Sequence, residues 1–149
     1  MIASEGYGRL RAEAWSSDNP GVTSDKPKIL VADDAATVRL LLTRTLESAG
    51  YDVAAVEEGS AACRAGIDGD FDLALLDHLM PGMLGTEILQ RWREANVGLR
   101  TIVLSGVDDD DLVIQLFELG AVDFVRKPFN IKELLIRMRI HLSALGAVG

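Results

Sequence analysis

The sequence predicts a doubly wound α/β fold, with a five-stranded parallel sheet in the strand order 2-1-3-4-5 and five flanking helices. Short runs of uninterrupted apolar residues recur along the chain, and such runs are typical of strands buried on both faces. Each run is followed by a stretch whose apolar residues are spaced as on one face of a helix. This alternation spans residues 28 to 144, and it favours a parallel sheet with right-handed crossovers.

The elements follow from these patterns in order along the chain. Five apolar segments are predicted to be strands: residues 29–32, 51–55, 73–76, 101–104 and 122–125. The first helix is predicted from Val38, Leu41, Leu42 and Leu46, and Gly50 is expected to end it. Four further helices are predicted from the same spacing in residues 60–67, 86–95, 112–117 and 131–142.

The composition fits one globular domain of 149 residues, with 48% hydrophobic and 26% charged residues. The formal net charge is −8, and an acidic surface repels phosphate backbones and anionic lipids. We therefore expect no direct contact with nucleic acid or with a membrane. The sequence has no apolar run of about 18 residues and no secretory signal pattern, so the cytoplasm is the expected location.

Three regions are expected along the chain: an N-terminal extension over residues 1–26, the main domain over residues 27–145 and a tail over residues 146–149. The extension is rich in Ser, Asp, Pro and Gly, which is typical of loops. It is interpreted either as a disordered leader or as a short docked helix that presents Trp15. Cys63 is the only cysteine, so an intrachain disulfide is excluded, and a small buried apolar role is expected.

Polar residues close four of the five apolar runs. They are Asp33, Asp34, Asp77, Ser105 and Lys127. In a doubly wound sheet, ligands bind at the carboxyl ends of the strands, near the point where the strand order reverses. We therefore expect these five side chains to converge in one crevice.

The chemistry of these residue types indicates a site for a cation and a phosphoryl group. Three crowded carboxylates repel one another by on the order of a few kcal/mol at intermediate effective dielectric. A divalent cation offsets this repulsion, and Mg²⁺ (or Mn²⁺) prefers a few carboxylates, waters and a phosphate oxygen. The ammonium of Lys127 and the hydroxyl of Ser105 suit the oxygens of a phosphoryl group.

Four segments resemble the receiver (REC) domain of two-component response regulators, the chemotaxis-Y-like family with a flavodoxin-like fold. They are ILVADD at 29–34, LLDHLMPGMLG at 75–85, LSG at 104–106 and GAVDFVRKPF at 120–129. Each segment alone is weak evidence, but all four occur in order and at the spacing of the family. The resemblance implies a phosphoacceptor signalling domain that catalyses only its own phosphorylation and dephosphorylation, and that is not otherwise an enzyme.

The resemblance assigns roles to the acids. Asp77 is implied as the nucleophile that takes a phosphoryl group from the phosphohistidine of a sensor histidine kinase or a phosphotransfer protein. Asp34 and Asp77 are implied as direct ligands of Mg²⁺, and Asp33 as a ligand acting mainly through a metal-bound water. The backbone carbonyl of Leu79 is implied as a further ligand.

The resemblance also implies a switch. Lys127 would bind the phosphoryl group, Ser105 would move toward it, and the aromatic ring of Phe124 would swing inward. Pro128 is expected to follow a cis peptide bond. The change of shape would control a downstream effector protein or an output domain. The family also suggests a homodimer through the face made by the fourth helix, the fifth strand and the fifth helix of the domain.

His78 and Leu84 depart from the family pattern and are candidate modulators. The family usually has an apolar residue at the first position, and His78 is interpreted either as a modulator of dephosphorylation or as a packed or solvated side chain. The family often has Asp or Asn at the second position, and Leu84 with Met83 predicts an apolar patch that contacts a partner. The acidic run 108–111 is interpreted as a helix start, where negative charge complements the macrodipole.

Other interpretations stand beside this one. Asp33 and Asp34 alone are typical helix caps, and a pseudo-receiver would keep the fold without accepting phosphate. A phosphatase with an Asp nucleophile needs a second Asp two residues later, where this chain has Leu79. A flavin-binding protein of the same fold needs a hydroxyl-rich phosphate loop, where this chain has two acids. The sequence leaves open whether the chain is a stand-alone regulator or a part of a longer protein.

Overall fold

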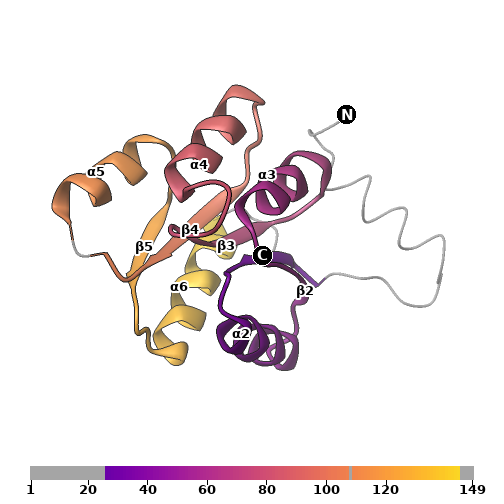
Figure 1. Cartoon of the computed structure of the whole chain (residues 1–149). Helices are drawn as coiled ribbons and strands as arrows, with labels where there is room; N and C mark the ends of the chain where they lie inside the picture. Colours follow the sequence, from indigo (N-terminus) through magenta and orange to yellow (C-terminus); the bar gives the residue numbers. More distant parts are fainter. Residues whose placement is uncertain (1–25, 108, 145–149) are drawn as a thin grey trace.

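The computed structural model describes residues 26–107 and 109–144, which form one parallel sheet with helices on both faces (Figure 1). The strands are β1 (Lys28–Ala32), β2 (Asp52–Val56), β3 (Leu73–Asp77), β4 (Arg100–Ser105) and β5 (Asp123–Arg126). The helices are α2 (Ala36–Ser48), α3 (Gly59–Asp68), α4 (Gly85–Glu94), α5 (Asp110–Glu118) and α6 (Ile131–Ala144).

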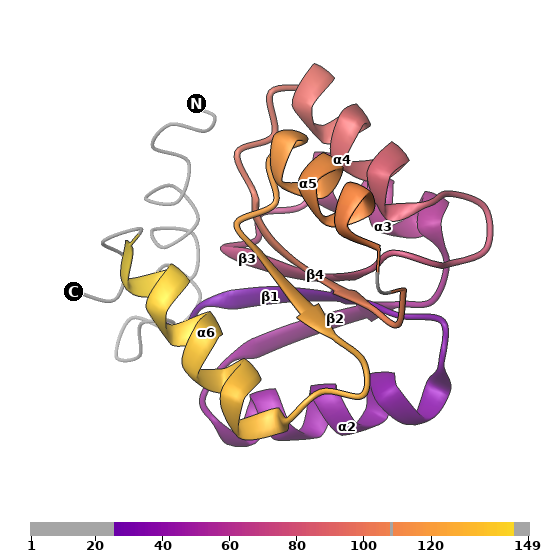
Figure 2. The same cartoon turned by 90° about the vertical axis from the view of Figure 1, so that its left-hand side faces the viewer.

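The predicted fold class and strand order are confirmed. The strands pair in parallel in the order β2-β1-β3-β4-β5. The two helices α2 and α6 cover one face of the sheet, and α3, α4 and α5 cover the other (Figure 2). Because β1 and β3 are neighbours while β2 lies outside β1, the strand order reverses between β1 and β3. This reversal is the position where a doubly wound sheet is expected to carry its ligand site.

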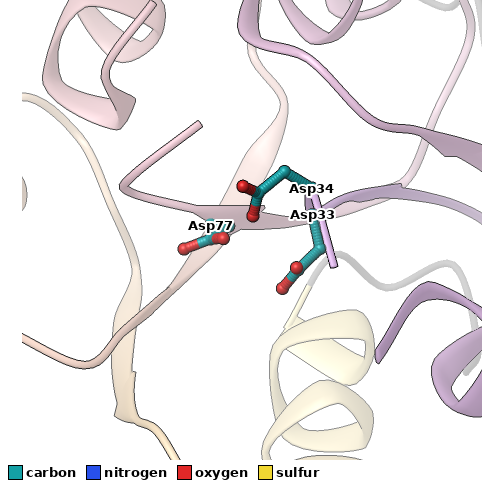
Figure 3. A group of neighbouring side chains, drawn as sticks. All are labelled: Asp33, Asp34 and Asp77. Atoms are coloured by element: carbon teal, nitrogen blue, oxygen red, sulfur yellow. The ribbon is translucent and has the colours of Figure 1, made fainter. Parts of the chain in front are cut away.

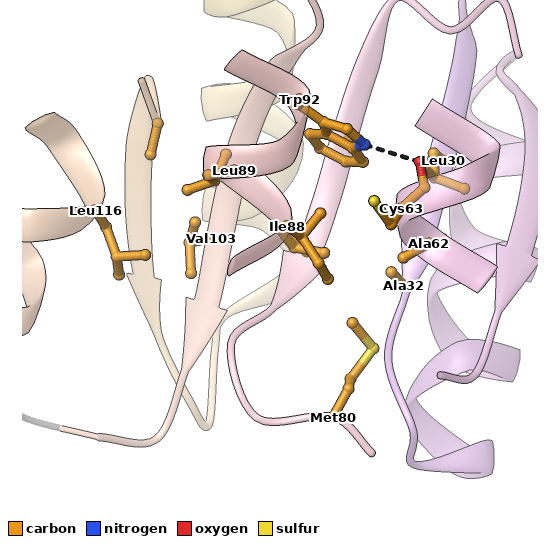
Figure 4. Packing of buried hydrophobic residues seen from close by; sticks show 13 residues of the cluster. Leu30, Ala32, Ala62, Cys63, Met80, Ile88, Leu89, Trp92, Val103 and Leu116 are labelled. Atoms are coloured by element: carbon orange, nitrogen blue, oxygen red, sulfur yellow. Dashed lines mark hydrogen bonds between the residues drawn. The ribbon is translucent and has the colours of Figure 1, made fainter. Parts of the chain in front are cut away.

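Alternate strand residues enter two separate buried layers, which explains the uninterrupted apolar runs. Leu30, Ala74 and Val103 point into the layer under α3, α4 and α5, where Trp92 also packs (Figure 4). Their neighbours along the strands enter the layer under α2 and α6, where Leu42 is fully buried. A strand with both faces covered by helices has no solvent side, so no polar alternation is selected.

Two apolar residues on the predicted helix faces are exposed to solvent and not buried. Leu41 on α2 is 51% exposed and Phe117 on α5 is 45% exposed, although both belong to the apolar spacing from which these helices were predicted. Each follows or precedes a fully buried leucine, Leu42 or Leu116, and lies on the flank of the helix. A helix on an open sheet buries only one stripe, and its flanking positions remain in contact with solvent.

Gly66 in α3 lies directly against the Trp92 ring, and this contact gives a testable prediction. A Cβ on Gly66 would lie 2.3 Å from the Trp92 ring. Trp92 is 2% exposed, and its indole N–H donates to the Cys63 carbonyl at 3.0 Å, so the ring is held in place. We expect Gly66→Ala to lower the free energy of unfolding by about 1–2 kcal/mol, because overpacking outweighs the gain in helix propensity. Urea denaturation would measure it.

The matched control for this prediction is Gly98→Ala. A Cβ there would meet no atom within 4 Å, so its effect should stay within about 0.5 kcal/mol. If both variants were equally stable, Trp92 would be free to move and the close packing described above would be incorrect.

The expectations for the N-terminal extension and the C-terminal tail concern residues that lie outside the described ranges, apart from Lys26. Within residues 26–107 and 109–144, no helix combines the length and the apolar character needed to span a membrane.

Candidate functional site

Three carboxylates gather at the carboxyl ends of β1 and β3, the two strands where the order reverses (Figure 3). One oxygen each of Asp33, Asp34 and Asp77 lies within 4.8 Å of the others. Asp33 and Asp77 are buried, with 0% and 5% exposure, whereas Asp34 is exposed. A cluster of oxygen ligands with one open side fits a hard divalent cation that keeps several waters.

Lys127 reaches the same cluster from the end of β5. Its Nζ lies 2.7 Å from Oδ2 of Asp33 and 3.2 Å from Oδ2 of Asp77. Its backbone amide donates to the Ser105 carbonyl at 2.8 Å, which continues the pairing of β4 with β5. The Lys127–Pro128 peptide bond is cis. Because its Nζ lies close to both Asp33 and Asp77, the Lys127 ammonium offsets the charge of these two buried carboxylates directly.

Asp33 is held at several of its atoms. Its Oδ1 accepts from the amide of Ala35 at 2.9 Å, just before α2 begins, and its own amide donates to the Val56 carbonyl at 3.2 Å. Asp33 does not cap α2, because the N-cap residue is Ala35 and it has no side-chain cap hydrogen bond. One oxygen of the Asp33 carboxylate accepts from the amide of Ala35, and the other accepts from Lys127.

Burial controls the titration of the cluster. It raises the pKa of Asp77 from 3.8 to about 6, with a further contribution from the charge of Asp33. Lys127 and the amide of Leu79, which donates to Oδ1 of Asp77 at 3.3 Å, act against this rise. For Lys127, burial lowers the pKa, but the hydrogen bond to Asp33 and the charge of Asp77 raise it more. Lys127 therefore remains an ammonium near neutral pH.

Ser105 and Phe124 lie near this cluster but belong to different surroundings. Ser105, at the end of β4, is 1% exposed, and its hydroxyl accepts from the amide of Val107 at 3.0 Å. Phe124 is half-buried and packs against the layer under α3, α4 and α5, with the Arg126 guanidinium 5.6 Å from the centre of its ring. The structure thus brings Asp33, Asp34, Asp77 and Lys127 together, and Phe124 packs half-buried against the apolar layer.

The two departures from the family pattern have different environments. His78 is 6% exposed, and burial lowers its pKa. Its Nδ1 faces Gly85, where a Cβ would lie 3.1 Å away, and finds no hydrogen-bond partner among the described residues. His78 is therefore packed. Leu84 is 41% exposed and Leu79 is 51% exposed, and both lie in the β3–α4 segment that follows Asp77.

The described part of the acidic run, residues 109–111, starts a helix as predicted. The carboxylate of Asp109 accepts from the amide of Asp111 at 2.9 Å, and α5 begins at Asp110. A capping carboxylate and acidic residues in the first turn are both favourable at the positive end of a helix dipole.

One residue of the site was missed by the sequence reasoning. Arg39, in the second turn of α2, donates from Nη1 to the backbone carbonyl of Asp33 at 2.8 Å. Its spacing of six residues after Asp33 was the available signal, since it places a long cationic side chain over the start of the helix that follows the acids.

The strand order is that of the flavodoxin-like receiver fold, and the pocket of Asp33, Asp34 and Asp77 is acidic. Together they define this protein as one of the receiver class. Comparison with known proteins agrees. The transcriptional regulatory protein ResD of Bacillus subtilis is 35% identical over 119 residues, which cover 80% of this chain and 49% of ResD. The phosphate regulon transcriptional regulatory protein PhoB of Pseudomonas aeruginosa is 36% identical over 120 residues, covering 79% of this chain and 52% of PhoB.

The solved receiver domain of the Francisella response regulator 1452 matches with a TM-score of 0.77 at 30% identity, over 80% of this chain and 99% of that domain. The family model "Response regulator receiver domain" matches residues 29–139, so the chain belongs to that family. It is a phosphoacceptor signalling domain of two-component systems and not an enzyme in the usual sense. The chain spans about half the length of the curated relatives it matches.

Proposed function

We propose that Asp77 accepts a phosphoryl group from a phosphohistidine, in a step that depends on Mg²⁺ or Mn²⁺. The phosphohistidine belongs to a sensor histidine kinase or a phosphotransfer protein. The observation that carries this proposal is the placement of Asp77, which is buried, has an oxygen within 4.8 Å of those of Asp33 and Asp34, and lies 3.2 Å from the Lys127 ammonium. A divalent cation and a phosphoryl group together account for three adjacent carboxylates beside a lysine.

Each residue has a role in this step. Asp34, Asp77 and the carbonyl of Leu79 would hold the cation directly, and Asp33 would act mainly through a bound water. The bound cation supplies positive charge that lets the carboxylates ionise together and that neutralises phosphoryl oxygens. The Asp77 carboxylate attacks phosphorus, the O–P bond forms as the P–N bond to the histidine breaks, and the imidazole leaves with the bonding electron pair. Lys127 binds the transferred group.

The output of the step is a change of shape. The new phosphoryl oxygens recruit the Ser105 hydroxyl and Lys127, and Phe124 follows by turning inward. Ser105 and Lys127 are already coupled through the hydrogen bond between their backbones. Structures with and without a phosphoryl mimic would show whether the Phe124 ring changes its rotamer.

The partner surfaces follow from exposed apolar residues. Leu84, at the rim of the site, is proposed to contact the kinase or phosphotransfer protein. A Leu84→Asp protein with unchanged kinase specificity would argue against this contact. His78, packed beside Asp77, is proposed to influence dephosphorylation, and the lifetime of the acyl phosphate in His78→Leu would test it.

A homodimer is proposed through the face of α5, β5 and α6, in which α5 and α6 lie on opposite sides of the edge strand β5 (Figure 2). Ile114 on α5 and Ile140 on α6 are 56% and 59% exposed, and they are candidate contacts of such a dimer. Light scattering before and after phosphorylation would measure the oligomeric state.

We further propose that residues 27–145 form the domain, with residues 1–26 as an extension and residues 146–149 as a tail. We propose that this domain acts in the cytoplasm on an effector protein or an output domain.

A small phosphodonor tests the proposed function without a known kinase. The purified protein is incubated with acetyl phosphate and either Mg²⁺ or EDTA, and intact mass spectrometry measures the addition of phosphate. We expect label with Mg²⁺, loss of that label on treatment with hydroxylamine, which cleaves acyl phosphates, and no label in EDTA. A protein that never becomes labelled would be a pseudo-receiver.

A further inference from the structure

We propose that Arg39 is a positioning residue that sets the affinity of the acidic pocket for a divalent cation. This inference rests on the proposed function, because it assumes that Asp33, Asp34 and Asp77 hold such a cation. In this role Arg39 touches neither the cation nor the phosphoryl group, and it acts through the backbone that carries the first two acids.

The contact of Arg39 with the pocket is specific. The Nη1 of Arg39 donates to the carbonyl oxygen of Asp33 at 2.8 Å, and the Arg39 side chain is only 21% exposed. Its other contact is an ion pair from Nη2 to Oε2 of Glu57 at 3.9 Å, and the Glu57 side chain is 63% exposed. An exposed pair at that distance contributes little, so the bond to the Asp33 carbonyl is the constraint that matters.

That carbonyl belongs to the peptide unit that joins Asp33 to Asp34. Asp33 is already held by Ala35, Val56 and Lys127, so its carboxylate has a fixed place. Among the described residues, no hydrogen bond or ion pair holds the exposed carboxylate of Asp34. The direction of the Asp34 side chain therefore depends on the peptide unit that Arg39 holds.

The guanidinium has two effects of opposite sign on a bound cation. Its positive charge repels the cation, so an effect of charge alone predicts tighter binding when Arg39 is neutralised. Its hydrogen bond fixes the peptide unit before Asp34, so a positioning role predicts weaker binding when the bond is lost. Residues that orient metal ligands typically change metal affinity by 10-fold or more when they are replaced. The sign of the change thus separates the two roles.

The test measures the binding of Mn²⁺ to the full chain by electron paramagnetic resonance of the free ion. We expect Arg39→Gln to weaken Mn²⁺ binding roughly 10-fold, because the shorter side chain cannot reach the Asp33 carbonyl. Arg39→Lys keeps the charge but has a shorter reach and a single donor atom, so we expect binding roughly threefold weaker. Arg44→Gln is the matched control, because Arg44 is an exposed arginine of the same helix, and we expect no change.

The outcomes are distinct for each variant. Tighter or unchanged Mn²⁺ binding in Arg39→Gln, or unchanged binding in Arg39→Lys, would overturn the positioning role. A lowered urea midpoint with unchanged Mn²⁺ affinity would also overturn it, since it would show a structural role only. If Arg39→Gln does not unfold cooperatively, the Arg39→Lys result decides. A wild-type protein that binds no Mn²⁺ would refute the cation site itself, and this inference with it.

Discussion

Asp77→Asn is expected to abolish phosphorylation of the protein by acetyl phosphate in the presence of Mg²⁺. An amide has no ionised oxygen to attack phosphorus, and Asp33, the other buried carboxylate of the pocket, is held more closely than Asp77. Oδ2 of Asp33 is 2.7 Å from Lys127 and its Oδ1 accepts from the Ala35 amide at 2.9 Å, whereas the corresponding contacts of Asp77 are 3.2 Å and 3.3 Å. Intact mass spectrometry at equal exposure to the donor measures the result.

The control for this experiment is Asp110→Asn, which removes an exposed carboxylate from the first turn of α5. It should be labelled like the wild type. Label that persists on Asp77→Asn would show that another residue is the acceptor, and peptide mapping of that label would identify it.

Asp77→Asn is also expected to stabilise the protein without a cation by about 3 kcal/mol at pH 7. Burial raises the pKa of Asp77 from 3.8 to about 6, and this rise corresponds to about 3 kcal/mol that the folded state loses when Asp77 ionises. The pKa of Asp77 is higher in the folded state than in the unfolded state. The contribution of the protonated Asp77 carboxyl to the free energy of unfolding is therefore fully present below about pH 3.8, and it is lost as the pH rises through about 6.

Urea unfolding in EDTA measures this prediction at two pH values. The difference in the free energy of unfolding between Asp77→Asn and wild type should fall to roughly half between pH 7 and pH 5. Saturating Mg²⁺ should reduce the difference at pH 7, because it stabilises the folded wild type by binding the ionised carboxylates. A variant less stable than wild type at pH 7 would mean that the attraction of Lys127 outweighs burial at Asp77. Asp110→Asn should show no such gain in stability.

Sequence reasoning was accurate where the pattern is local. The strands β1, β3 and β4 were found because helices cover both of their faces, so most of their residues are apolar and buried. Helix faces were less certain, and Leu41 and Phe117 show why. Their spacing is that of the buried residues on the same helices, but each lies on the flank of its helix and stays in contact with solvent. The exposed fraction of a flanking residue depends on the neighbouring helix, which spacing cannot reveal.

The candidate site divides in the same way. Five side chains were expected together because parallel strands end at one edge of the sheet, namely Asp33, Asp34, Asp77, Ser105 and Lys127. Arg39 was missed because its function lies in a bond to a backbone carbonyl, and a motif of side-chain types carries no signal for such a bond. The packed state of His78 was also undecided, because burial next to Gly85 depends on how α4 enters the domain.

By itself, the sequence determined the alternation of strands and helices and the five polar residues that close four of the strands, because these depend on periodicity and strand direction. Only the tertiary structure decided which oxygen each donor reaches, how far Asp77 is withdrawn from water and which arginine holds the acidic turn. Those properties arise from the packing of elements distant in the chain, where differences of about an ångström decide whether a hydrogen bond forms.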